Sequence, residues 1–255
     1  MKSYKLIACA FLAAIAFILQ VPNEILGYPT GFGMTVDLAA VPVMLALFIF
    51  GAEYSFLILM ALGAMIMFFA PTGAVGSVMK VGATLPMVLV PYYIAKSKTL
   101  ADYFYVAVAT FVGVLLLFYV TTSIYPYINS GLLEYMVGII PIAVLFGLFY
   151  YASKDSKYYA KLSDLKVAIL ALILAIILRG AVATISNLYF AGPVFYHMPP
   201  EEFITILNSL EIPLLGKGMG WFVIFFWNAM QGAVEFAIAW ILAFRFGLAK
   251  RYGEE

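Results

Sequence analysis

Three polar side chains stand on one face of the last long apolar segment. In "GWFVIFFWNAMQGAVEFAIAWILAF", Asn228, Gln231 and Glu235 are spaced three and then four residues apart, which places them on one side of a helix. The preceding apolar segment contains Arg179 near its middle and Asn187 near its end. A charged group in the middle of a membrane helix costs about 2.5–3.5 kcal/mol, so these side chains need partners or a ligand.

Two interpretations of these residues remain open. Arg179 and Glu235 could form a buried ion pair that does no more than fix helix packing. The amides of Asn187, Asn228 and Gln231 lie near one depth of the predicted membrane, which favours a polar pocket. Lys80 opens another apolar segment from the same side, directly after "APTGAVGSVM". Amides beside aromatic side chains such as Trp227 also suit a flat heteroaromatic ligand.

The same residues offer no recognisable catalytic set. The sequence lacks a G-x-x-x-x-G-K-[ST] loop for ATP and lacks H-E-x-x-H. Its one histidine, His197, falls in a predicted loop, and its one cysteine, Cys9, falls in an apolar segment, so we expect no metal site. We therefore expect a binding protein rather than an enzyme, with no cofactor.

The composition is that of a membrane protein. Hydrophobic residues make up 65% of the chain and charged residues 11%, the mean hydropathy is +1.06, and soluble domains carry about 25% charged residues. Apolar segments of bilayer length predict an all-α integral membrane bundle in the cell membrane. We count eight spans, near residues 5–21, 36–52, 54–70, 77–95, 102–124, 133–152, 166–189 and 219–245.

The basic residues predict the orientation of this multi-pass bundle. If the N-terminus is inside, the inner segments contain 11 of the 14 Lys and Arg residues. This is the asymmetry of the positive-inside rule, so we expect both termini to be cytoplasmic. The net charge of +1 argues against a nucleic-acid partner.

Two predicted loops face the outer side. The first, 22–35, leads to Asp37, whose carboxylate we expect to accept hydrogen bonds from exposed amides where a helix begins, with Pro42 tolerated in the first turns. The second, 190–218, contains the amphipathic stretch "PEEFITILNSLEI", which predicts a short helix across the outer face. Long ordered loops of this kind often act as lids.

Five stretches, in order, resemble one family. They are "AFLAAIAFIL" at 10–19, "MTVDLAAVPVMLALFIFG" at 34–51, "PTGAVGSVMKVGATL" at 71–85, "NLYFAGPVFY" at 187–196 and "FFWNAMQGAVEFAIAWILAFR" at 225–245. Together they resemble the substrate-binding S components of energy-coupling factor (ECF) vitamin transporters, most closely the riboflavin-specific ones. The resemblance covers about residues 5–99 and 165–248.

The resemblance implies an architecture and a mechanism. The family core has six helices, so 1–255 would be one transmembrane domain with a core of 1–99 and 153–255 and an inserted helix pair at 100–152. The chain would be the high-affinity substrate-binding subunit of an ECF-type ABC importer for riboflavin. Its partners would be the lipid bilayer, a transmembrane coupling subunit and two cytoplasmic ATPases. Ala10 and Ala14 would form the face that docks on the coupling subunit.

The resemblance also implies the substrate contacts and shows two departures. Asn187, Asn228 and Gln231 would donate or accept hydrogen bonds to the vitamin, while Asp37 would lie at the pocket entrance. Riboflavin-specific members carry a lysine where Gln231 stands, and the second acidic position of their "DFSDVP" segment is Ala40 here. These departures keep a second hypothesis open, an S component for another small vitamin or precursor.

A third hypothesis is a membrane enzyme that acts on lipid or isoprenoid headgroups. Such enzymes normally hold Mg²⁺ with acidic pairs in their loops, and no D-x-x-D or D-x-x-x-D pair lies at a predicted membrane edge. Composition alone does not exclude a structural or channel protein.

Overall fold

The computed structural model describes residues 3–20, 28–96, 108, 112, 156–212, 215–217 and 219–253. Within these residues the chain is almost entirely helical. The predicted spans 102–124 and 133–152, and with them the inserted helix pair, lie outside the described residues except for positions 108 and 112.

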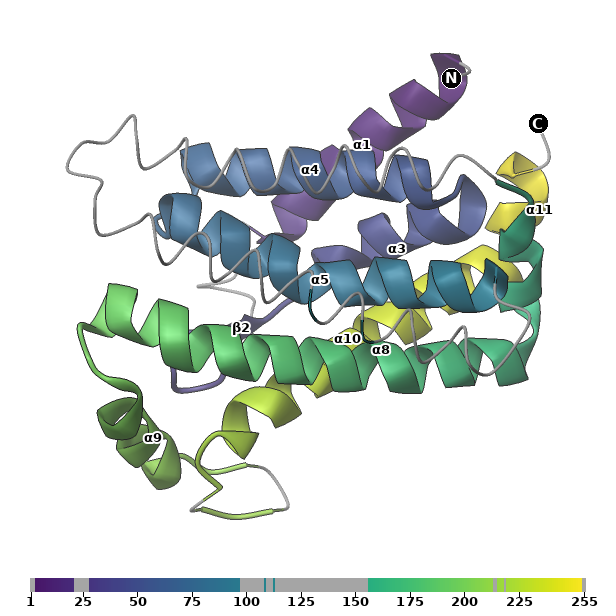
Figure 1. Cartoon of the computed structure of the whole chain (residues 1–255). Coiled ribbons are helices and arrows are strands. Elements are labelled where there is room, and N and C mark those ends of the chain that lie inside the picture. The colour runs from purple at the N-terminus through teal and green to yellow at the C-terminus, as the bar shows by residue number, and fades with distance from the viewer. Residues whose placement is uncertain are drawn as a thin grey trace.

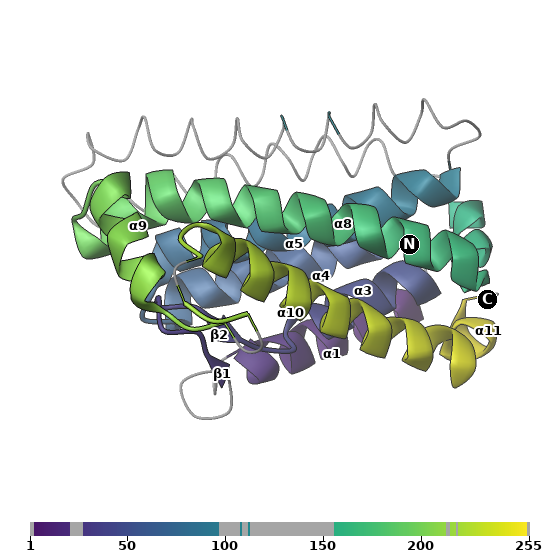
Figure 2. The ribbon, with the colours of Figure 1, turned by 90° about the horizontal axis from the view of Figure 1, so that it is seen from below.

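Five of the described helices are long and apolar enough to cross a membrane. They are α1 (Ser3–Gln20), α4 (Ala52–Phe69), α5 (Gly73–Lys96), α8 (Leu165–Ser186) and α10 (Phe222–Trp240). Figures 1 and 2 show α4, α5, α8 and α10 side by side in one elongated bundle, with α1 beside α4. The prediction of an all-α protein with membrane-length helices is confirmed at this level, and five of the eight predicted spans match these helices.

The predicted span at 36–52 contains a shorter helix than expected. Only Ala40–Ile49 forms a helix (α3), and all ten of its residues are buried. At 1.5 Å per residue this helix is about 15 Å long, about half the thickness of a bilayer core. It ends because Gly51 adopts a φ of 109°, a conformation that favours glycine, before α4 begins at Ala52. Helix α3 is therefore buried within the bundle, where it packs against α1, α4 and α10.

The segment before α3 is extended. Strands β1 (Tyr28–Pro29) and β2 (Thr35–Val36) pair antiparallel, with Tyr28 opposite Val36. They form a small hairpin in the segment that was predicted as the first outer loop. This hairpin delivers Asp37 to the end of the bundle where α3 begins.

The second predicted outer loop is partly helical. Helix α8 continues without a break into a π-helix, η3 (Asn187–Tyr196), so residues 190–196 are not a loop. The predicted amphipathic helix is present as α9 (Pro200–Ser209), which buries Phe203 and Leu207 and carries Glu201 and Glu202 in its first turn. Helix α9 lies across one end of the bundle (Figure 1).

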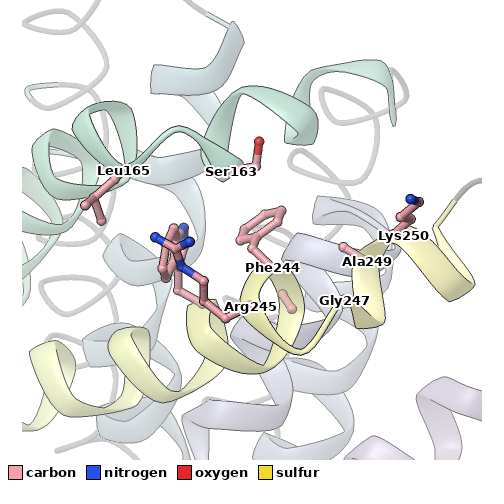
Figure 3. Close-up of a pocket in the computed structure, with 9 residues that line it drawn as sticks. Ser163, Leu165, Phe244, Arg245, Gly247, Ala249 and Lys250 are labelled. Atoms are coloured by element: carbon pink, nitrogen blue, oxygen red, sulfur yellow. The ribbon is translucent and has the colours of Figure 1, made fainter.

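The other end of the bundle gathers short elements and basic side chains. It contains η2 (Ser156–Ser163), the π-helical end of α10, η4 (Ile241–Arg245), and α11 (Leu248–Tyr252). A pocket opens between these elements (Figure 3). The first turn of α1 and the last turn of α5 lie at the same end (Figure 1). We refer to it as the basic end, and to the end under α9 as the cavity end.

Candidate functional site

A cavity of about 310 Å³ lies at the cavity end. Its wall combines the turn of the β-hairpin and the segment after it with the near ends of α1, α4, α5, α8, η3 and α10. Five of the six residues predicted to bind substrate line it, together with one member of the predicted ion pair: Asp37, Lys80, Asn187, Asn228, Gln231 and Arg179. Side chains that lie far apart in the sequence thus meet around one space.

Asp37 and Lys80 form an ion pair in the cavity wall. The Nζ atom of Lys80 lies 2.7 Å from both carboxylate oxygens of Asp37, and the backbone N–H of Ala39 donates to Oδ1 over 2.8 Å. Asp37 therefore accepts a hydrogen bond just before α3, as predicted. Lys80 lies two turns inside α5 rather than at its start, because α5 already begins at Gly73.

The predicted ion pair of Arg179 and Glu235 is present and fully buried. Nη1 of Arg179 donates to Oε2 of Glu235 over 2.7 Å, and the two side chains are 1% and 0% exposed. Gly232 makes room for it, since a Cβ atom there would lie 3.0 Å from Cδ of Arg179. The ion pair therefore leaves neither the guanidinium nor the carboxylate as an unpaired charge in the apolar interior.

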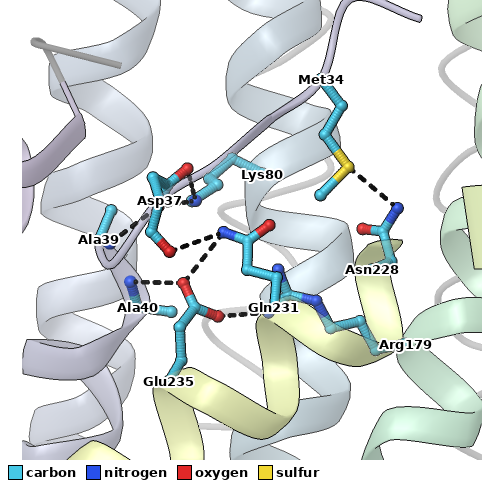
Figure 4. A network of polar contacts seen from close by, with 9 residues as sticks. All are labelled: Met34, Asp37, Ala39, Ala40, Lys80, Arg179, Asn228, Gln231 and Glu235. Carbon is cyan, nitrogen blue, oxygen red and sulfur yellow. Dashed lines mark hydrogen bonds and ion pairs between the residues drawn. The ribbon is translucent and has the colours of Figure 1, made fainter. Parts of the chain in front are cut away.

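Glu235 has a second role that the sequence did not reveal. Its Oε1 accepts the backbone N–H of Ala40 over 3.2 Å, so a carboxylate from α10 caps the first turn of α3 (Figure 4). A negative charge at a helix N-terminus is favourable because the exposed amides there carry partial positive charge. Glu235 thus joins α3, α8 and α10 at the floor of the site.

The three amide side chains use their NH₂ groups within the protein. Nε2 of Gln231 donates to Oε1 of Glu235 over 3.1 Å and to the carbonyl oxygen of Asp37 over 3.2 Å. Nδ2 of Asn228 donates to the Ile224 carbonyl over 3.0 Å and contacts the sulfur of Met34 at 3.3 Å (Figure 4).

Asn187 also uses its NH₂ group within the protein, since its Nδ2 donates to the Ala183 carbonyl over 2.8 Å. No hydrogen bond from another described residue occupies the side-chain oxygen of any of the three amides. Each amide is therefore held by its nitrogen, and its oxygen can accept a hydrogen bond from a molecule in the cavity.

The charges around the cavity balance. Lys80 is paired with Asp37 and Arg179 with Glu235. The Nε atom of Arg179 is buried and has no hydrogen-bond partner among the described residues. This wall suits a neutral, polar molecule that donates hydrogen bonds, because a charged ligand would have to displace one of the ion pairs.

The aromatic part of the wall differs from the prediction. Trp227 is 4% exposed and packs edge-on against Phe226, with 5.5 Å between the ring centroids, so it lies outside the cavity lining. The aromatic residues of the lining are instead Phe32, Phe69, Phe195 and Tyr196. Sequence reasoning missed Phe195 and Tyr196 because it assigned them to a loop, although the apolar run of α8 continues to them.

Tyr196 also closes one side of the cavity. Its hydroxyl donates to the carbonyl oxygen of Phe32 over 2.9 Å, and its ring stacks on Phe203 of α9 with 5.3 Å between the centroids. The end of η3, the turn of the β-hairpin and α9 are therefore tied together above the polar side chains.

Ala10 and Ala14 lie on the exposed side of α1. The buried side of this helix is formed by Cys9, Ala13 and Ala16. The two alanines and their exposed neighbours Ile7 and Phe11 leave this face of α1 accessible to another helix.

Taken together, the structure is an α-helical bundle with helices long enough to span a membrane and a cavity lined by polar side chains near one end. Comparison of the chain with protein-family models, with curated protein sequences and with solved structures gave no match.

Proposed function

We propose that this chain is the substrate-binding S component of an ECF-type vitamin importer, and that it binds riboflavin in the cavity at the end of the bundle. One observation carries the proposal: five of the six residues chosen from the sequence as ligand contacts lie around a single cavity. Its volume of about 310 Å³ is at the lower end of the 300–1,000 Å³ that is typical of small-molecule sites.

The chemistry of the wall supports a flavin. An isoalloxazine ring is flat, so it can pack on the aromatic side chains of the lining. Its imide N–H and the hydroxyls of the ribityl chain are donors, and Asn187, Asn228 and Gln231 offer free carbonyl oxygens to them. Riboflavin carries no net charge, which agrees with the paired charges of the wall.

Gln231 supports the second candidate, an S component for another small vitamin or precursor. Riboflavin-specific proteins carry a lysine at the matching position. Here the nearby cation is Lys80 of α5, which binds the carboxylate of the same Asp37 whose carbonyl accepts from Gln231. A cation is thus present beside the amides, but it is held by a carboxylate.

The proposal includes partners and an orientation. Ala10 and Ala14 would dock on a transmembrane coupling subunit that carries two cytoplasmic ATPases, because small side chains let helices approach closely. The cavity end would face outward and the basic end the cytoplasm of a cell-membrane protein. The chain itself would bind the vitamin without catalysing a reaction.

Flavin fluorescence tests the proposal directly. Riboflavin is titrated with the purified full-length protein, and we expect saturable quenching and a yellow chromophore in protein isolated from membranes. Asn228→Leu/Gln231→Leu should abolish quenching, because both carbonyl acceptors are lost. Asn208→Leu makes the same chemical change on the exposed face of α9 and should leave quenching unchanged.

The other outcomes separate the hypotheses. A folded wild-type protein that does not quench riboflavin but is stabilised by another vitamin would favour the second candidate. Binding that survives in the double variant would remove the two amides from the site. No stabilisation by any vitamin would reject the S-component proposal and favour the membrane-enzyme hypothesis.

A further inference from the structure

A second pocket, of about 370 Å³, lies at the basic end. It opens between the start of α8, the π-helical turn η4 and α11 (Figure 3). Its wall includes the aromatic Trp240 and Phe244, the cations Arg245 and Lys250, and Leu165 at the rim. The vitamin-binding proposal does not use this pocket.

Arg245 is held in place by an aromatic ring. The guanidinium carbon of Arg245 lies 5.3 Å from the centre of the Trp240 ring, a cation–π contact. The indole N–H of Trp240 donates to the carbonyl oxygen of Leu162 over 2.7 Å, which fixes the ring against η2. The guanidinium is therefore pre-positioned, and its N–H donors remain available at the pocket.

Neither cation of the pocket is neutralised by a described carboxylate. No ion pair with another described residue involves Arg245 or Lys250. Asp164 directly follows Ser163 of the pocket. Its Oδ1 atom accepts the backbone N–H of Lys166 over 2.8 Å at the start of α8. Figure 3 shows Arg245 and Lys250 on opposite sides of Phe244, so positive charge flanks the pocket.

The surroundings increase this positive potential. Among the residues that the structure describes, other basic side chains of this end include Lys5, Lys96, Lys166 and Arg251, and the acidic ones are Glu53 and Asp164. An anion is the ligand that this electrostatic environment favours.

An exposed apolar track leads away from the pocket along α8. Leu165 at the rim, Ile169 and Ile173 are 49%, 47% and 46% exposed, and their four-residue spacing places them in line on the helix. Phe246 directly follows η4 and is also exposed, at 69%. A molecule that fits both the cationic pocket and the apolar track has an anionic head and an apolar chain. Neither free phosphate nor an acidic peptide combines these two parts.

We propose that this pocket binds the headgroup of an anionic phospholipid. Arg245 binds the phosphate, Lys250 stabilises the negative charge from the other side of Phe244, and an acyl chain follows Leu165, Ile169 and Ile173. Basic pockets between helices at a membrane surface are suited to such headgroups. The site is independent of the proposed vitamin cavity, which lies at the other end of the bundle.

Native mass spectrometry of the full-length protein with phosphatidylglycerol or phosphatidylcholine of identical acyl chains tests the proposal. We expect the wild type to retain phosphatidylglycerol in preference, and each basic side chain to contribute about fivefold to that preference. Arg245→Gln and Lys250→Gln should therefore each lower the preference about fivefold, while Lys217→Gln, at an exposed lysine of the cavity end, should leave it unchanged. The melting temperature in phosphatidylcholine verifies that each variant is folded.

Three results would overturn the proposal. They are equal retention of the two lipids by the wild type, a preference that persists in Lys250→Gln and in Arg245→Gln, and displacement of the lipid by millimolar inorganic phosphate. The last result would identify a site for a free anion. Leu165→Asn/Ile169→Asn should lower retention of both lipids, and unchanged retention would reject the acyl track.

Discussion

At the scale of single residues, Glu235 holds the polar wall of the cavity together. Its two carboxylate oxygens bind Arg179, Gln231 and the amide of Ala40. The Gln231 side chain can present its oxygen to the cavity because its nitrogen is occupied by Glu235 and by the backbone of Asp37. The orientation of Gln231, a proposed ligand contact, therefore depends on Glu235, which is itself fully buried.

Glu235→Gln should destabilise the protein strongly. The substitution keeps an oxygen for the Ala40 amide but leaves the buried Arg179 charge unpaired, and breaking a buried pair in this way costs about 3–5 kcal/mol. Adding Arg179→Met removes that charge, so the double variant should recover part of the loss. Thermal unfolding in detergent measures both effects. A single variant as stable as the wild type would show that the pair does not stabilise the bundle.

At the scale of elements, the close approach of α10 to α5 and α8 depends on Gly232. A Cβ atom at this position would lie 3.0 Å from Cδ of Arg179 and 3.1 Å from the sulfur of Met87. Arg179 is held by its ion pair with Glu235, so it has little freedom to move away. The helices meet closely at the depth where the polar network needs them.

Gly232→Leu should therefore separate these helices. We expect a loss of about 1–3 kcal/mol in stability, the usual cost of overpacking, and weaker ligand binding because Arg179 is displaced. Ala237→Leu is the matched control, since Ala237 lies on the exposed side of the same helix. Melting temperatures of the two variants make the comparison, and equal values would contradict the proposed close packing.

At the scale of the whole molecule, the two ends of the bundle differ in charge. The basic end carries both α11 and the first turn of α1, and the cavity end carries α9 (Figure 1). Because positively charged segments stay on the cytoplasmic side during insertion, we expect the cavity to open outward. This orientation is the one an importer requires, with the ligand captured outside.

Cysteine labelling in intact cells tests this orientation. In a Cys9→Ala background, Thr205→Cys on the exposed face of α9 should react with a membrane-impermeant maleimide. Lys250→Cys on α11 should react only after the cells are permeabilised. The reverse pattern would place the cavity in the cytoplasm and contradict uptake from outside.

The sequence by itself determined that the chain forms membrane-length helices, and it indicated most of the polar side chains that line the cavity. Membrane-length helices are local features, because hydropathy and length need no knowledge of neighbours, so α1, α4, α5, α8 and α10 could be predicted. The cost of charge in hydrocarbon predicted that Arg179 and Glu235 need partners or a ligand, and a pair between them was one of two open interpretations. Helical spacing brought Asn228 and Gln231 to one face.

Only the tertiary structure decided how these parts meet. The apolar run at 36–52 looks like a span, but Gly51 ends α3 and the surrounding helices bury it. Lys80 meets Asp37 across 43 residues of sequence, and Glu235 caps a helix to which it is not adjacent in the chain. Hydropathy reports the preference of a segment for an apolar environment, and both lipid and protein interior satisfy it. The choice between them, and the atom that each amide turns toward the cavity, depend on contacts between distant residues.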